Sequence, residues 1–264
     1  MHRHAHRILK ADPVMAALMQ AAGPCRLQSR AQHEPFEALA RAIAHQQLHG
    51  AAAESILARF VALFDSPDFP SPQQLLAVPD RQVRAVGFSA AKTAALKDLA
   101  TKTLEGVVPP RAELASLSDL EIIERISRVR GIGRWTVEMM LMFQLKRRDV
   151  LPVDDFGVRN GFRLAYGLKA MPTPRALAQF GERWQPYRSI AAWYLWRAVE
   201  LARDGRLSPC TRPPRIALVK PAKSARSARS AKAAQSLQAR SAHTARAHSP
   251  KARRKARRRS AAPR

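Results

Sequence analysis

The sequence predicts an all-α protein, and three observations support this prediction. Alanine and leucine recur at steps of three and four residues from Phe36 to Phe64, as they do along one face of an amphipathic helix. Helix-start signals precede several of these stretches, most clearly Ser71-Pro72 and Ser118 with Glu121 three residues later. No stretch alternates polar and apolar residues convincingly, so no strand is predicted.

Glycine and proline set the predicted helix ends. Gly50 interrupts the first long helical stretch, Pro79 ends the helix that Ser71 caps, and Gly87-Phe88-Ser89 divides the next stretch in two. The predicted helices, in chain order, span residues 36–48, 50–64, 72–78, 80–86, 90–105, 119–129, 135–145, 156–166, 174–184 and 189–201.

Composition divides the chain into three parts. Residues 1–33 hold only a short apolar run at Val14–Met19 and are predicted to be irregular, whereas residues 34–208 hold all the predicted helices. Residues 209–264 form a tail rich in Lys, Arg, Ala and Ser, with 17 Lys or Arg and no Asp or Glu from Thr211 onward. The tail has few large apolar side chains whose burial could offset its ordering entropy, so it is predicted to be disordered.

The charge of the chain indicates a polyanionic partner. The formal net charge is +26, and the first 210 residues alone, with 29 basic and 20 acidic residues, still carry +9. Cys25 and Cys210 provide neither a disulfide framework nor the four thiolates of an iron–sulfur cluster. No segment approaches the 18 apolar residues of a membrane helix, and the N-terminus lacks the apolar region of a secretion signal. We therefore expect a reduced, intracellular protein without a membrane anchor.

The most informative motif is a glycine turn between two predicted helices. Gly131-Ile132-Gly133 precedes an apolar helix, whose first backbone N–H groups are free to hold a phosphate. Three arginines surround the turn with positive charge: Arg128, Arg130 and Arg134. A carboxylate pair, Asp154-Asp155, follows about one helix length later. A carboxylate at a fixed reach from a phosphate clamp suits cleavage of a nucleotide bond, although the turn alone would also fit an ordinary connection between helices.

Together with three other blocks, this motif resembles a known family, the helix–hairpin–helix DNA glycosylases with a Gly/Pro-rich loop and a catalytic aspartate. The most similar subgroup is DNA-3-methyladenine glycosylase II. The blocks are Ala42–Leu48, Gly87–Ala94, Gly131–Thr136 with Leu151–Asp155, and Arg183–Ser189, and the resemblance covers about residues 35–205. It implies a two-lobed helical bundle.

The resemblance also implies an enzyme activity. The expected reaction is release of alkylated bases of the 3-methyladenine or 7-methylguanine type from double-stranded DNA by base flipping and hydrolysis of the N-glycosidic bond, which begins base excision repair. Asp155 is then the catalytic residue, and a fixed carboxylate suits this chemistry because positive charge develops on the sugar. Asp154 is expected to cap the following helix, although reversed roles, or capping by both without catalysis, stay open at this point.

Position 135 bears on the reaction products. Family members that also cut the DNA backbone carry a lysine two residues after the second hairpin glycine, where it forms a Schiff base. Trp135 stands there in this chain and offers no amine. The resemblance therefore implies a monofunctional glycosylase that leaves an abasic site.

Aromatic side chains are expected to bind the flipped base. An electron-rich ring attracts a cationic alkylated purine more than a neutral base, and damaged bases are easier to extrude. The candidates are Trp135, Phe156, Tyr187 and Trp196.

The remaining expected contacts lie at two turns. The resemblance assigns DNA binding to the loop Gln46-Gln47-Leu48, where Gln47 or Leu48 would be the wedge that fills the gap left by the flipped base, with His49 as a further candidate. At the hairpin, it assigns four DNA-contacting residues: Gly131, Gly133, Arg134 and Thr136. It also implies a structural sodium or potassium ion on three hairpin carbonyls, those of Ser127, Val129 and Ile132. No cofactor is expected to be required, and no iron–sulfur cluster is expected.

Other functions stay open on the sequence alone. They are a glycosylase of the same fold for another base lesion, a DNA-binding protein without catalysis, and a chromatin-like protein that acts through its tail. In the favoured interpretation the chain is a monomer, associated with the nucleoid in the cytoplasm of a bacterium or located in the nucleus of a eukaryote.

Overall fold

The computed structural model describes residues 3–27, 33–48, 50–64, 66, 68–208, 210, 212 and 214–218, so most of the predicted disordered tail lies outside the described residues. Within these ranges the regular structure is helical, apart from one isolated antiparallel bridge between Pro172 and Leu218. The helices are α1 (Arg3–Lys10), α2 (Pro13–Ala22), α3 (Pro35–His45), α4 (Gly50–Val61), α5 (Pro72–Ala77), α6 (Asp80–Ala85), α7 (Ala90–Leu104), α8 (Arg111–Leu114), α9 (Asp119–Ile126), α10 (Arg134–Phe143), α11 (Phe156–Ala165), α12 (Pro174–Gly181), the 3₁₀ helix η1 (Glu182–Trp184) and α13 (Arg188–Arg203). The prediction of an all-α protein is confirmed.

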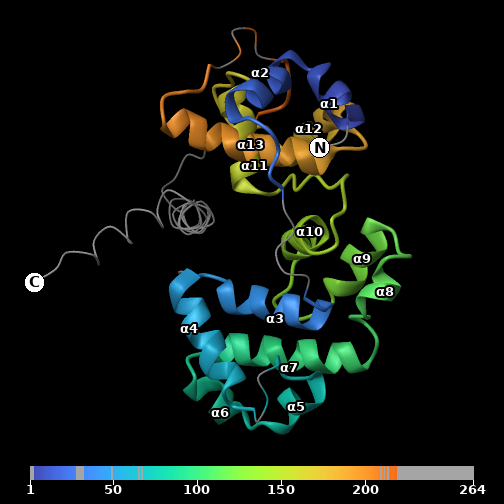
Figure 1. Cartoon of the computed structure of the whole chain (residues 1–264), viewed down its shortest axis with the longest axis vertical. Coiled ribbons are helices and arrows are strands. Elements are labelled where there is room, and N and C mark those ends of the chain that lie inside the picture. The colour runs from blue at the N-terminus through green and yellow to red at the C-terminus, as the bar shows by residue number, and fades with distance from the viewer. Residues whose placement is uncertain are drawn as a thin grey trace, which may run out of the picture.

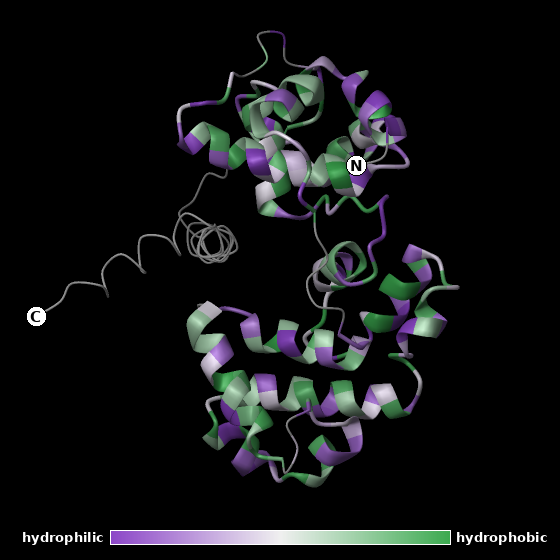
Figure 2. Ribbon diagram, viewed as in Figure 1, coloured by the Kyte–Doolittle hydropathy of each residue, from purple (hydrophilic) through white to green (hydrophobic). Residues whose placement is uncertain are grey.

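The helices form two lobes (Figure 1). One lobe contains α3 to α9, and the other combines α1 and α2 with α11 to α13. The chain thus starts in one lobe, builds the second, and returns to the first through α10, which lies between them (Figure 1). Hydrophobic and hydrophilic residues alternate in bands along the helices of both lobes, as in amphipathic helices (Figure 2).

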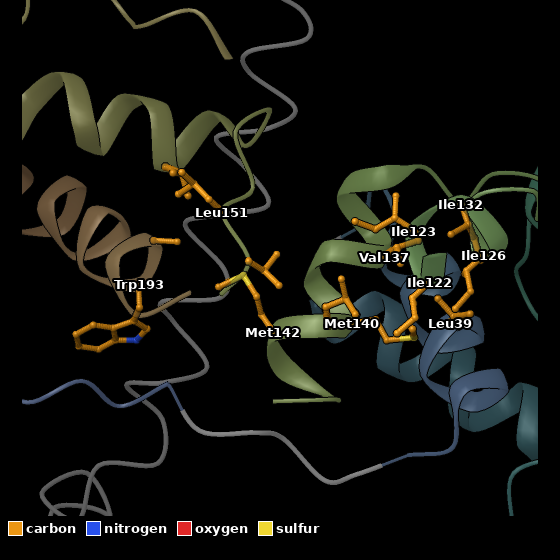
Figure 3. Close-up of a cluster of buried hydrophobic side chains, with 14 of the residues drawn as sticks. Leu39, Ile122, Ile123, Ile126, Ile132, Val137, Met140, Met142, Leu151 and Trp193 are labelled. Atoms are coloured by element: carbon orange, nitrogen blue, oxygen red, sulfur yellow. The ribbon is translucent and has the colours of Figure 1, made fainter. Parts of the chain in front are cut away.

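Helix α10 contributes to the buried core on both sides. Its residues Val137 and Met140 lie with side chains of α3 and α9, whereas Met142 lies toward Leu151 and Trp193 of the other lobe (Figure 3). All five of these side chains are buried. Because α10 begins at the hairpin and packs between the lobes, it fixes the hairpin relative to both.

Local sequence signals set many helix ends where they were predicted. Ser71 with Gln74 and Ser118 with Glu121 both form reciprocal capping boxes. Gly87, with φ of +116°, separates α6 from α7. The short α8 was not predicted, since four residues carry too little periodicity to stand out.

The prediction that residues 1–33 are irregular is wrong, because two helices form there. Asp12 caps α2 by accepting hydrogen bonds from the backbone N–H groups of Val14 and Met15. Helix α2 packs against α13 and buries Met15, while α1 buries Ala5 and Leu9. These helices are short, and their stability comes from packing against a distant part of the chain, which local periodicity does not reveal.

Asp12 also holds the N-terminal helices to the rest of their lobe. Its Oδ2 accepts hydrogen bonds from the Tyr166 hydroxyl at 2.5 Å and from Trp184 Nε1 at 3.2 Å. Burial, together with the negative charge of Asp12, raises the pKa of Tyr166 well above its ordinary value, so the hydroxyl stays a donor.

We expect Asp12→Ala to lower the free energy of unfolding by about 2–4 kcal/mol, because the substitution leaves two buried donors unpaired and removes a helix cap. Urea unfolding of the native chain and the variant measures this loss. The matched control is Asp204→Ala, at an exposed residue after α13. An equal effect of the two substitutions would contradict the assigned role of Asp12.

Candidate active site at the hairpin and Asp155

The hairpin between α9 and α10 presents a row of free backbone donors. Gly131 has φ of +76°, and Ile132 N donates to Val129 O at 3.1 Å, which closes the turn. Gly133 is the N-cap residue of α10. Among the described residues, no acceptor is present for four backbone N–H groups, those of Gly131, Gly133, Arg134 and Trp135. Such a group at the positive end of a helix binds phosphate.

Side chains from two other helices hold the hairpin in place. Asp98 of α7 accepts a hydrogen bond from Arg130 N at 2.7 Å. Gln46, at the end of α3, donates from Nε2 to Gly131 O at 2.9 Å. We call the hairpin with its four free backbone N–H groups the phosphate clamp. It is held in place by the lobe that contains α3 to α9.

Asp155 lies at the start of α11, directly after the Pro152 turn. It is 5% exposed and caps α11, with Oδ1 accepting from Val158 N at 2.7 Å. Oδ1 also accepts from Trp196 Nε1 at 2.9 Å, and Oδ2 accepts from Trp135 Nε1 at 2.8 Å. An ionised carboxylate only accepts hydrogen bonds, so three donors suit the charged form and leave room for a further contact at Oδ2.

The expectation that Asp154 caps the following helix is wrong. The cap is Asp155 itself, and Asp154 is exposed to solvent. Capping alone does not account for Asp155, because two indole N–H groups from distant helices also converge on it. A carboxylate that only capped α11 would need neither indole.

Two of the four predicted aromatic residues meet at Asp155, and a third aromatic residue, which was not predicted, stacks on one of them. Trp135 is 42% exposed, so it combines a bond to the carboxylate with an accessible ring. The Trp196 ring stacks on Phe143, with ring centroids 6.0 Å apart and an interplanar angle of 20°. Phe143 is the last residue of α10 and resembles a core residue in the sequence, where nothing distinguishes it from its apolar neighbours. We call Asp155, Trp135, Trp196 and Phe143 the Asp155 cluster.

The other two predicted aromatic residues lie differently. Phe156 follows Asp155 as the first residue of α11 and is partly buried. Tyr187 is buried at the start of α13, where its ring lies 5.8 Å from the ring of His4. Trp196 lies nine positions after Tyr187, which is about 13 Å along the helix axis. The structure therefore places Tyr187 apart from the Asp155 cluster.

The segment that leads to Asp155 is pinned to α13, the helix that carries Trp196. Ser189 Oγ donates to Arg147 O at 2.8 Å and accepts from Val150 N at 3.0 Å. Arg188 forms a bidentate pair with Asp149 at 2.8 and 2.9 Å. These contacts fix the distance between the carboxylate and its indole partner.

The turn predicted to carry the wedge, residues Gln46–Leu48, lies beside the hairpin. The further candidate His49 lies outside the described residues. Gln47 is exposed and has φ of +56°, whereas Leu48 is partly buried against the core. At the hairpin, Thr136 is buried and donates through its backbone N–H to Gly133 O. Its side chain lies within the protein rather than on the surface with the glycines.

Glu138 is a buried carboxyl near the same site. It is 2% exposed, and its Oε1 accepts from Arg134 Nε at 2.8 Å, while its Oε2 has no partner in the described part of the chain. Burial raises the pKa of Glu138 against the lowering effect of Arg134, and the charges of Asp154 and Asp155 raise it further.

A pH dependence of stability follows from this raised pKa. Between pH 4.5, the ordinary value, and the raised pKa, the folded chain holds the Glu138 proton more tightly than the unfolded chain does, so in this window the residue makes the unfolding free energy fall as pH rises. We expect Glu138→Gln to remove this contribution, so that the stability difference between variant and native chain shifts in favour of the variant as pH rises above 4.5. Urea unfolding at a series of pH values tests this, and a difference that does not change with pH would contradict it.

Two further observations concern ligands and location. In the described residues no group of three or more His, Cys, Asp or Glu side chains is arranged to hold a metal ion. No helix in the same ranges is long and apolar enough to cross a membrane.

Comparison with known proteins agrees with this geometry. The family described as "HhH-GPD superfamily base excision DNA repair protein" matches residues 40–186, which include the hairpin and Asp155. The chain is 43% identical over 175 residues to DNA-3-methyladenine glycosylase 1 of Schizosaccharomyces pombe, an alignment that covers 66% of this chain and 77% of that protein.

Two solved structures are also similar. The S. pombe 3-methyladenine DNA glycosylase in complex with abasic DNA is 40% identical, with a TM-score of 0.65 and coverage of 75% of this chain and 98% of that one. The DNA-3-methyladenine glycosidase of Bacillus halodurans is 30% identical, with a TM-score of 0.71 and coverage of 78% and 94%. The hairpin, the buried aspartate and these matches together show that the chain belongs to the helix–hairpin–helix superfamily of base excision DNA repair proteins.

Proposed function

We propose that the chain is a monofunctional DNA glycosylase of the DNA-3-methyladenine glycosylase II type, which acts as a monomer on double-stranded DNA with alkylated bases. The observation that carries this proposal is the buried Asp155 carboxylate, which accepts hydrogen bonds from the indole N–H groups of Trp135 and Trp196. Trp135, the second residue of α10, links it to a hairpin of free backbone donors. The related enzymes named above support the choice of substrate.

Each part of the site has a role in this reaction. The hairpin donors and Arg134 bind a backbone phosphate, and the turn at Gln47 and Leu48 occupies the space that the flipped base leaves. A cationic alkylated base binds against the indole rings of the Asp155 cluster. The bond between C1′ and the base nitrogen then breaks, and the base leaves as a neutral molecule.

Asp155 stabilises the sugar cation that forms as this bond breaks. Its negative charge is fixed before the reaction, so no reorganisation is needed when the charge develops. Water adds to C1′, and its proton is released, which leaves an abasic site. A cationic leaving group departs without prior protonation, which explains how one carboxylate suffices for alkylated purines.

The proposal includes a monovalent cation but no other cofactor. The carbonyls of Ser127, Val129 and Ile132 follow the C-terminus of α9, where the helix dipole favours positive charge. The buried Ser127 Oγ has no partner among the described residues, which fits a nearby ion. Sodium or potassium would stiffen the hairpin and add positive charge beside the bound phosphate.

The expected products are free base and an uncut abasic strand. A lyase reaction needs an amine that attacks C1′, and Trp135 provides none at the hairpin. Denaturing gels of an end-labelled alkylated duplex, with and without later alkali, distinguish the two outcomes. Strand cleavage without alkali, or a protein–DNA adduct trapped by borohydride, would contradict monofunctional hydrolysis.

A further inference from the structure

Helix α7 links the wedge turn to the hairpin. Here the wedge turn means residues Gln46–Leu48. Lys92 Nζ donates to Ala44 O at 2.7 Å, where α3 ends, and burial lowers the pKa of Lys92. Asp98, six residues further along α7, accepts from Arg130 N at 2.7 Å at the start of the hairpin. These two attachment points are about 9 Å apart along the helix axis.

Gln46 adds a direct bond between the same two turns. Its Nε2 donates to Gly131 O at 2.9 Å, although the two residues are 85 positions apart in the sequence. The residue that follows, Gln47, has φ of +56° and leads the chain into the wedge turn. His45, the residue before Gln46, is hydrogen-bonded through Nε2 to Glu54 Oε1 of α4 at 3.0 Å. Contacts with α4, α7 and the hairpin thus hold the backbone on the N-terminal side of the wedge turn.

The bond from Gln46 also orients a peptide plane of the hairpin. In a trans peptide the C=O and N–H groups point in opposite directions. Gln46 holds the Gly131 carbonyl on one side, and the next N–H, that of Ile132, donates to Val129 O on the other. Displacement of Gln46 therefore turns the peptide plane between Gly131 and Ile132, which lies between the free N–H groups of Gly131 and Gly133.

We propose that Gln46 is a positioning residue that couples the wedge turn to the phosphate clamp, so that capture of a phosphate by the hairpin drives insertion of the wedge and extrusion of the base. This rests on the proposed function. Gln46 itself contacts no reacting atom. Its effect belongs to the extrusion step, before Asp155 acts.

The test replaces Gln46 by methionine, which keeps the length of the side chain but cannot donate a hydrogen bond. Single-turnover base release is measured on two duplexes with the same alkylated base, one with the base paired and one with it unpaired in a one-nucleotide bulge. An unpaired base is already partly extruded, so it needs the wedge much less. The control variant is Gln82→Met, at an exposed residue of α6.

We expect Gln46→Met to slow release from the paired duplex about tenfold and to change release from the bulged duplex by less than about twofold. Gln82→Met should change neither rate. The bond is solvent-exposed, so thermal stability should stay close to that of the native chain. Equal slowing on both duplexes would mean that Gln46→Met damages the active site. Unchanged release from the paired duplex would mean that the bond has no role in extrusion. Either result overturns the proposal.

A second measurement separates this proposal from the proposed function. In the Asp155→Asn background, 2-aminopurine beside the lesion reports unstacking by its fluorescence without any chemistry. Addition of Gln46→Met should slow the fluorescence rise about tenfold. If the native chain released no base but this slowing were observed, the coupling would stand and the glycosylase activity would fail. An unchanged rise would remove the coupling alone.

Discussion

Asp155→Asn should slow single-turnover release of an alkylated base by about a thousandfold or more, because the fixed negative charge next to the developing sugar cation is lost. The amide also disturbs the hydrogen bonds of the site. One oxygen of Asn can still cap α11 and accept from Trp196, but its NH₂ group would then face the indole N–H of Trp135, donor against donor. The charge and the geometry are both affected, which is why we expect this substitution to have the largest effect on activity.

DNA binding by the same variant should be unchanged or tighter. The hairpin donors do not depend on Asp155, and the substitution removes a negative charge that faces a polyanion. Asp154→Asn is the matched control, since Asp154 is the exposed neighbour and both indole N–H groups donate to Asp155 instead. Equal activity of Asp155→Asn and the native chain, or an equal loss in both variants, would contradict the assignment of catalysis to Asp155.

Gly161→Ala should have a large effect on both stability and activity. A Cβ atom at Gly161 of α11 would lie 1.9 Å from Leu195 O and 2.6 Å from the Leu195 carbonyl carbon of α13. Both contacts are with backbone, so no side-chain rotation relieves them, and α13 must move. Since Trp196 follows Leu195 directly, the movement displaces the indole that donates to Asp155.

We expect this substitution to lower the free energy of unfolding by about 2–3 kcal/mol or more. Where the variant is still folded, we expect base release about tenfold slower than in the native chain. Gly50→Ala is the control for stability, because a Cβ at Gly50 has no atom within 4 Å. Urea unfolding, followed by the near-ultraviolet signal of the tryptophans, measures the stability of both variants. A loss at Gly161 no larger than at Gly50 would show that the two helices do not pack as closely as described.

Much of the fold could be predicted from local signals. The capping boxes at Ser71 and Ser118, and the glycine at position 87, determine helix ends through atoms within a few residues. The N-terminal helices could not be predicted in this way. Their main attachment, Asp12 to Tyr166 and Trp184, joins residues more than 150 positions apart.

The same distinction applies to the site. Asp155 could be named in advance because its spacing from the hairpin matches a family pattern, and Trp135 and Trp196 could be named from the family resemblance. Phe143, Gln46 and Asp98 owe their places to packing between helices, so residue type alone did not reveal their contacts. The misassigned helix cap has a similar cause: the cap and the two indole bonds are all made by Asp155, and one of these indoles comes from the distant helix α13.

The most direct test of the central claim is the release of bases from methylated double-stranded DNA by the full native chain, with the released compounds identified by chromatography and the Asp155→Asn chain as the control. We expect 3-methyladenine and 7-methylguanine to appear in solution with the native chain and not with the control, while both chains bind the DNA. Binding by the native chain without release of any methylated base would contradict it, and would leave a DNA-binding protein whose buried aspartate serves only to cap a helix.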